Sequence, residues 1–120
     1  MSDSAVTKEC ILNAAEGASR RGEWLLVVFT ADWCQECPKF KGELHEHVLD
    51  AYRVQLVTVD CGDEHTEDLK TEHEVAKLPT MLVVGGDGSV IARLVAPPVG
   101  EVRKVAQRLF KPRLCLTAEF

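Results

Sequence analysis

The spacing of apolar residues along the chain predicts a series of alternating helices and strands. Apolar positions recur at helical spacing over residues 4–20, and Gly22 follows as a stop signal. Leu25–Ala31 shows no alternation, which predicts a central strand covered on both faces. Two later apolar runs flank Gly85-Gly86-Asp87-Gly88, a strong β-hairpin signal. The other predicted elements are helices over 39–48, 66–73 and around 102–109, and strands over 54–59, 80–84 and 90–95.

The order of these elements, α-β-α-β-α-β-β-α, predicts an α/β fold of three layers. A helix between the first two strands implies a parallel crossover, and the hairpin adds an antiparallel edge. We therefore expect helices on both faces of a mixed central sheet of about four strands. Residues 1–112 would form this domain, and residues 113–120 a C-terminal tail. Leu114, Leu116 and Phe120 would suit either a packed extension or a partner contact, and the sequence leaves this open.

Composition narrows the possible functions. A chain of 120 residues forms one domain, and a net charge of −5 without a basic cluster argues against binding nucleic acid. The polar start lacks the apolar core of a secretory signal, and no apolar stretch is long enough to span a membrane. Five cysteines, an odd number, fit a reducing compartment better than a disulfide scaffold. We expect a cytoplasmic monomer that requires no cofactor.

The candidate chemistry lies directly after the first strand, where Cys34 and Cys37 are three residues apart. The helix that follows begins with a partial positive charge from its aligned peptide dipoles, which stabilises a nearby thiolate. Three residues span about one helical turn, so the second sulfur can reach the first and close a disulfide. Such a pair can accept a disulfide from another protein through a mixed-disulfide intermediate.

A structural zinc site is the alternative interpretation of this pair. Cys61 and His65 would complete four ligands, and Cys61 ends a strand that should run parallel to the one before Cys34. Parallel strands end at one edge of a sheet, so the cysteines should lie near one another.

The other cysteines and the histidines have simpler interpretations. Cys10 lies on the apolar stripe of the first helix and is expected in the core, while Cys61 suits a buried apolar position or a third redox thiol. Cys115 in the tail would be exposed and could link two chains, and Trp24 is expected to be a packing residue. Solvated helix positions are expected for His45, His47, His65 and His73.

Two motifs together resemble the thioredoxin family. Ala31-Asp32-Trp33-Cys34-Gln35-Glu36-Cys37 is similar to the family's active-site motif, and Leu78-Pro79-Thr80 is similar to its cis-proline segment. The resemblance covers roughly residues 24–110. It implies a thioredoxin-like fold in which Cys34 is the exposed attacking thiol and Cys37 the buried resolving thiol. It also implies a groove for an extended substrate segment, lined by Trp33, Gln35, Glu36, Leu78, Pro79 and Ala96.

The chain departs from the family pattern between the two cysteines, at two positions of the strands, and at Gly42, where the family has a helix proline. Gln35-Glu36 replaces the Gly-Pro common in thioredoxins, and the negative charge of Glu36 opposes formation of a thiolate beside it. Thioredoxins carry a buried aspartate six residues before the first cysteine, where this chain has Val28, and a companion lysine where it has Leu56. The usual proton acceptor for Cys37 is therefore missing, and Glu36 or a water would have to take its place.

The leading hypothesis is an enzyme, a thiol–disulfide oxidoreductase that reduces or exchanges protein disulfides. By resemblance, Cys34 attacks the target disulfide, Cys37 releases the reduced target, and a reductase or a small thiol restores the dithiol. The alternative is a protein-binding module on the same fold, in which the absent acid leaves redox turnover slow. Neither hypothesis involves a nucleic acid or a membrane.

Overall fold

The helices and strands follow one another in the predicted order. The computed structural model describes residues 7–112. A π-helical turn, η1, continues the second helix, and a short 3-10 turn, η2, precedes the third. The elements are α1 (Lys8–Arg20), β1 (Trp24–Thr30), α2 (Cys37–Leu44), η1 (His45–Leu49), β2 (Val54–Asp60), η2 (Glu64–Thr66), α3 (Glu67–Glu72), β3 (Thr80–Val84), β4 (Val90–Val95) and α4 (Val99–Leu109).

Local chemistry sets the boundaries of the first elements. The Thr7 hydroxyl accepts a hydrogen bond from the backbone N–H of Cys10 and caps the start of α1. Gly22 follows the helix with a φ of 73°, a left-handed conformation that glycine adopts without strain. Gly88 has a φ of 89° in the turn between β3 and β4. The predicted helix stop and hairpin are therefore confirmed.

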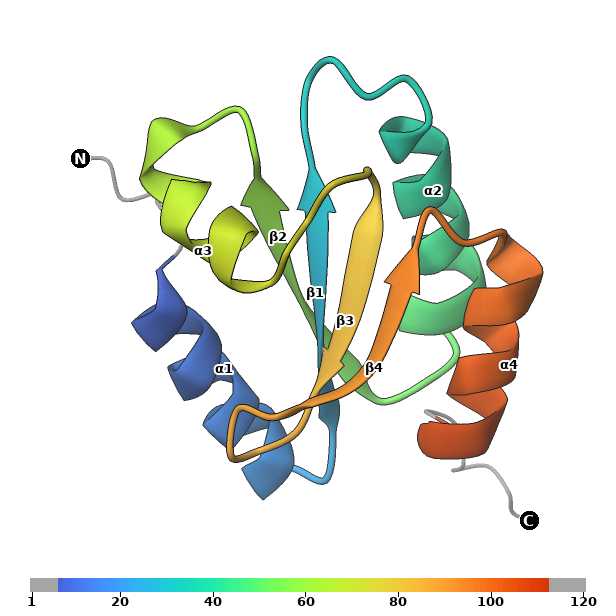
Figure 1. The fold of residues 1–120 in the computed structure, drawn as a ribbon. Coiled ribbons are helices and arrows are strands. Elements are labelled where there is room, and N and C mark those ends of the chain that lie inside the picture. Colours follow the sequence, from blue (N-terminus) through green and yellow to red (C-terminus); the bar gives the residue numbers. More distant parts are fainter. Residues whose placement is uncertain (1–6, 113–120) are drawn as a thin grey trace, which may run out of the picture.

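A four-stranded mixed sheet forms the middle layer, with α1 and α3 on one face and α2 and α4 on the other (Figure 1). The strand order is β2-β1-β3-β4; β1 pairs parallel with β2 and antiparallel with β3. β1 is thus central, and six of its seven residues are buried because helices cover both faces. The predicted α/β fold with three layers and a mixed sheet is confirmed.

The register of the two parallel strands brings the candidate site to one edge of the sheet. Thr30 pairs with Asp60, so β1 and β2 end side by side. The backbone N–H of Cys61 extends this pairing by donating to the carbonyl of Thr30 at 2.7 Å. The expectation that Cys61 would lie at the edge where the Cys34 loop begins is confirmed.

Two apolar cores lie on opposite faces of the sheet. Alternate residues of β1 divide between them: Val28 packs with Phe40 and Met81 under α2 and α4, and Phe29 packs with Leu69 under α1 and α3. Trp24 packs against the first core, and its indole N–H donates to the carbonyl of Leu109 at 3.0 Å, as its assignment to packing implied.

The expected burial of Cys10 is wrong. Cys10 is exposed, and the buried stripe of α1 consists of Ile11, Ala15 and Ala18. Helical spacing shows which face of a helix is apolar, but it does not show how far burial extends around the helix. The position of the sheet under the helix determines which residues are covered. The predicted tail of residues 113–120, including Cys115, lies outside the described residues.

Candidate active site

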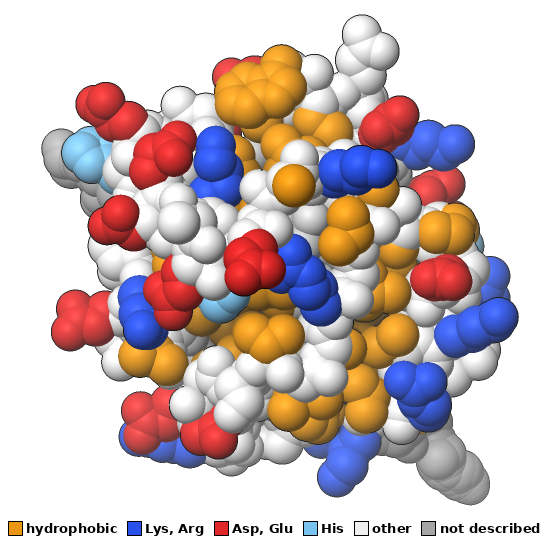
Figure 2. Space-filling model, in the orientation of Figure 1, with side chains coloured by type: hydrophobic (Ala, Val, Ile, Leu, Met, Phe, Trp, Pro, Cys, Tyr) orange, Lys and Arg blue, Asp and Glu red, His pale blue; other side chains and the backbone are white. Residues whose placement is uncertain are grey.

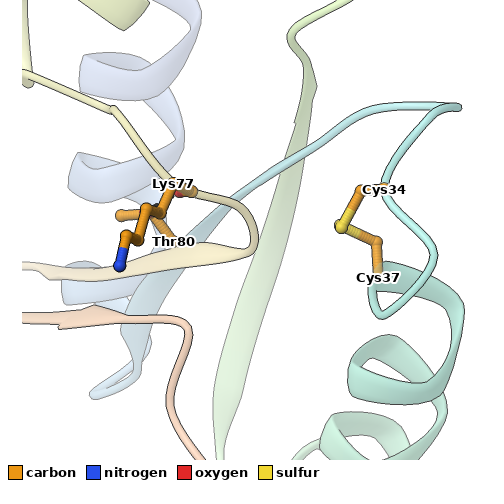
Figure 3. The surroundings of a disulfide bond; sticks show 4 residues. All are labelled: Cys34, Cys37, Lys77 and Thr80. Atoms are coloured by element: carbon orange, nitrogen blue, oxygen red, sulfur yellow. Dashed lines mark hydrogen bonds between the residues drawn. A yellow bond between two sulfur atoms is a disulfide. The ribbon is translucent and has the colours of Figure 1, made fainter.

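The two cysteines are joined by a disulfide at the start of α2 (Figure 3). Their Cα atoms are 5.5 Å apart. α2 begins at Cys37, so Cys34 lies in the turn before the helix rather than in its first turn. Cys37 is 3% exposed whereas Cys34 is half-buried, so the first sulfur is the more accessible one. This difference in exposure matches the one expected between an attacking and a resolving thiol.

The segment before β3 faces this disulfide (Figure 3). The Leu78–Pro79 peptide bond is cis, as the resemblance implied. The Thr80 hydroxyl donates to the carbonyl of Lys77 at 2.6 Å, and the backbone N–H of Ala96 donates to the carbonyl of Pro79 at 2.7 Å. These two bonds fix both ends of the turn, so the proline is held in position on the side of the site across from α2.

Arg93 holds the loop that leads into this segment. Its guanidinium donates to the backbone carbonyls of His73 and Glu74, the latter at 2.8 Å. These carbonyls close α3, where a cation is favourable because the helix C-terminus carries partial negative charge. His73 is half-buried and its ring lies tilted against that of Phe29, so its expected place as a solvated helix residue is only partly correct. β4 thereby fixes the start of the loop that ends at Pro79.

A pocket of about 440 Å³ lies on one side of Cys34. Four residues expected at the substrate groove line it: Trp33, Gln35, Glu36 and Leu78. Sequence reasoning missed Lys70, Val75 and Ala76, which complete the wall, because no local motif marks residues that reach the site from α3 and its following loop.

A second groove, of about 280 Å³, lies between α2 and the turn before α4. It contains the remaining expected residues, Pro79 and Ala96, and Glu36 lines both this groove and the pocket. Ala96 adopts a φ of 44°, which is unusual for a residue other than glycine. The residues expected at the site thus line two adjoining depressions that share Glu36, and Cys34 lines the first of them.

Cys61 lines the pocket beside Cys34. It is 4% exposed, and burial raises the pKa of its thiol. This favours the interpretation of Cys61 as a buried apolar residue over that of a third redox thiol. Across residues 7–112, no group of three or more His, Cys, Asp or Glu side chains is arranged to hold a metal ion. The zinc alternative, which would use Cys34, Cys37, Cys61 and His65, gains no support there.

The family's buried acid has no counterpart inside this chain. Val28 is fully buried and belongs to the core formed with Phe40 and Met81, and Leu56 packs against the same core. The position of the family's acid is therefore apolar in this chain, and any proton acceptor for Cys37 has to come from another side chain or from water.

Cys10 differs from Cys61 in a way that can be measured. The Thr7 hydroxyl donates to the Cys10 sulfur at 3.2 Å and lowers the pKa of this exposed thiol, while Glu9 opposes it. At neutral pH a larger fraction of Cys10 than of Cys61 is therefore thiolate. In the oxidised protein we expect iodoacetamide to alkylate Cys10 before Cys61, as followed by peptide mass spectrometry. Thr7→Val should slow the labelling of Cys10, and Thr7→Ser should not; equal rates for both cysteines would contradict the assignment.

Comparison with known proteins identifies the family. A family model described as thioredoxin-like matches residues 11–86, and the chain belongs to this family. Within residues 7–112, none of the helices combines the length and apolar character needed to cross a membrane.

Individual relatives are distant. A protein disulfide-isomerase of Medicago sativa is 29% identical over 68% of this chain, but the match spans only 17% of the relative's own length. Mitochondrial thioredoxin-3 of Saccharomyces cerevisiae is 28% identical over 77% of this chain and 70% of its own. The crystal structure of oxidised thioredoxin O2 from Arabidopsis thaliana superimposes with a TM-score of 0.68, covering 86% of both chains at 23% identity. The last similarity confirms the thioredoxin-like fold.

Proposed function

We propose that this chain is a thiol–disulfide oxidoreductase that reduces or exchanges protein disulfides through Cys34 and Cys37. One observation carries the proposal: an accessible and a buried cysteine close a disulfide beside a pocket and a cis-proline turn. A target disulfide in this pocket lies next to the Cys34 sulfur. Cys34 attacks it and forms a mixed disulfide, and Cys37 then displaces the reduced target. The relatives named as thioredoxins and protein disulfide-isomerase support the same assignment.

The surface beside the site suits targets that are proteins rather than small molecules. Trp33 is 64% exposed, although large aromatic side chains are usually covered. In the space-filling view, hydrophobic side chains run from the top of the molecule down the middle of the face, with acidic residues concentrated on the α3 side (Figure 2). A partner's apolar side chains would contact this strip. The electron donor would be a reductase or a small thiol, and the protein would act as a cytoplasmic monomer.

The reduction potential provides a test of the proposed direction. Glu36 is exposed at the start of α2 and opposes the thiolate of Cys34, so the dithiol form is less favoured than in a strong oxidant. We expect the wild-type protein to turn over insulin disulfides and to show a two-electron potential below that of protein disulfide isomerase, about −180 mV. Titration against glutathione measures it. A potential well above this value would contradict a role as a reductase.

The apolar surroundings of Val28 favour a second candidate, a protein-binding module that turns over slowly. In that case the groove would hold a partner protein, and Cys37 would only rarely displace that partner from a mixed disulfide with Cys34. Binding of a partner by wild type and by Cys34→Ser alike, without insulin reduction by either, would favour this candidate over the enzyme.

A further inference from the structure

A hollow of about 460 Å³ lies on the side of the disulfide that neither substrate depression occupies. Cys34 and Cys37 both line it, and the other lining residues come from the end of β1, the active-site loop, α2 and the end of β2. Its polar lining includes Thr30, Asp32, Lys41 and Asp60. Cys37 is therefore bordered on this side by a space whose lining carries charged and hydroxyl side chains, whereas the position of the family's acid, Val28, is apolar.

The Thr30 hydroxyl is a buried polar group in the lining of this hollow. Thr30 is 7% exposed, and within residues 7–112 its side-chain oxygen makes no hydrogen bond. The hydroxyls of the two other buried threonines of this region, Thr66 and Thr80, do donate to backbone carbonyls. A buried hydroxyl without a partner is costly, and such groups are usually satisfied by ordered water. The hollow that Thr30 lines has room for several waters.

Lys41 is the cation in the lining of this hollow. It lies four residues after Cys37, one turn along the same face of α2, and lines the hollow with it. Among the described residues no carboxylate lies within ion-pair distance of Lys41. Lys77 points away from the disulfide in Figure 3. The opposing charges are those of Asp32 and Asp60 across the hollow, and of Glu36, which lines the two depressions on the other side.

We propose that Lys41 and Thr30 take over the task of the acid that is absent at position 28. Lys41 is a positioning residue that stabilises the Cys37 thiolate through its charge, and Thr30 holds the water that accepts the Cys37 proton. The inference rests on the proposed oxidoreductase function and concerns its second step, the release of the target.

The step balances with this chain, water and the target alone. In the mixed disulfide the Cys34 sulfur is bonded to a target sulfur, and Cys37 is a thiol. Cys37 gives its proton to the water at Thr30, and its electron pair forms the bond to the Cys34 sulfur. The bond between Cys34 and the target breaks, and the target leaves as a thiolate that takes a proton from solvent. The protein dithiol is oxidised by two electrons, and the target disulfide has gained them.

Release can be measured with dithiobis-nitrobenzoate as the target. Cys10→Ser, Cys61→Ala and Cys115→Ser together give a background with only the two site cysteines. Cys34 takes up one thionitrobenzoate in the first phase, and Cys37 expels it in the second, which is followed by stopped-flow absorbance between pH 5 and pH 9.

In this background we expect Lys41→Met to slow the second phase about two- to five-fold at pH 7 and to move its pH profile to higher pH. The difference in rate between Lys41→Met and the background protein should shrink in 1 M salt, where the Debye length is about 3 Å. Lys41→Arg should restore the wild-type profile. Lys104→Met is the matched control: Lys104 is also an exposed lysine, on the neighbouring helix α4, and it lines neither the hollow nor the two substrate depressions, so the second phase of this variant should not change.

Two further variants test the negative charge of Asp60 and the transfer of the Cys37 proton to water at Thr30. Asp60→Asn removes a negative charge but keeps the oxygen that accepts from the Gly62 N–H, so the profile should move to lower pH. Thr30→Val should slow the second phase, and an unchanged rate would overturn the role given to Thr30. Identical second phases in Lys41→Met and Lys104→Met would overturn the role given to Lys41. Absence of any second phase in the background protein would refute the proposed function itself.

Discussion

Replacing Cys34 by serine is expected to abolish reduction of insulin disulfides. A serine hydroxyl stays protonated at neutral pH and cannot exchange with a disulfide, so no mixed disulfide forms. Turnover should fall to the rate of the small-thiol reductant alone, whereas the fold should persist because Cys34 is half-buried at the edge of the pocket. The rate of insulin precipitation in dithiothreitol measures the effect.

The matched variant Cys37→Ser should give a different result. Cys34 still attacks the target, but no second thiol displaces it, so the mixed disulfide should accumulate. A reductant should cleave these covalent adducts. Mass spectrometry of the trapped species would then identify the physiological targets. If Cys37→Ser trapped nothing while Cys34→Ser did, the two roles would be reversed. If both variants reduced insulin as fast as wild type, the chemistry would lie elsewhere.

Introducing the absent acid by Val28→Asp is expected to destabilise the fold by about 3–5 kcal/mol at pH 7. Val28 is fully buried on the central strand, and its neighbours on the adjacent strands are Met81 and Thr58. Phe40 packs in the same core. No cation replaces the family's lysine, because that position is Leu56. A carboxylate at position 28 would therefore lose its hydration without gaining a partner.

The destabilisation should depend on pH. Burial raises the pKa of such an aspartate above its value of about 3.9 in the unfolded chain, so the folded state binds more protons. Relative to wild type, the stability of the variant should then fall as pH rises from about 4 towards the raised pKa. Urea unfolding at pH 4 and pH 7 measures this difference.

Val28→Asn is the control for this prediction. An asparagine side chain has nearly the same shape as that of aspartate and is also polar, but it does not titrate. Its loss of stability relative to wild type should be similar at both pH values. A Val28→Asp protein as stable as wild type at pH 7 would show that the core beside Cys37 is more polar than the packing of Phe40 and Met81 indicates.

Much of the fold and the reacting atoms could be predicted because they depend on short-range pattern. The uninterrupted apolar run of β1 required cover on both faces, and the structure buries it between two layers of helices. Two cysteines one turn apart could reach each other wherever the chain placed them, and they do. The cis-proline turn was identified by resemblance rather than by composition, since the residues around Pro79 carry no other signal.

The sequence by itself therefore determined the order of the elements, the sheet they form and the pair of sulfurs, since each is encoded by neighbours within one turn or one strand. Only the tertiary structure decided the surroundings of those sulfurs. Lys70 and Val75 reach the pocket from α3 and its loop, and Thr30 and Asp60 meet beside Cys37 because two parallel strands end in register. Cys10, expected inside, is exposed. Chain segments distant in sequence create these environments, and local spacing carries no information about which of them will meet.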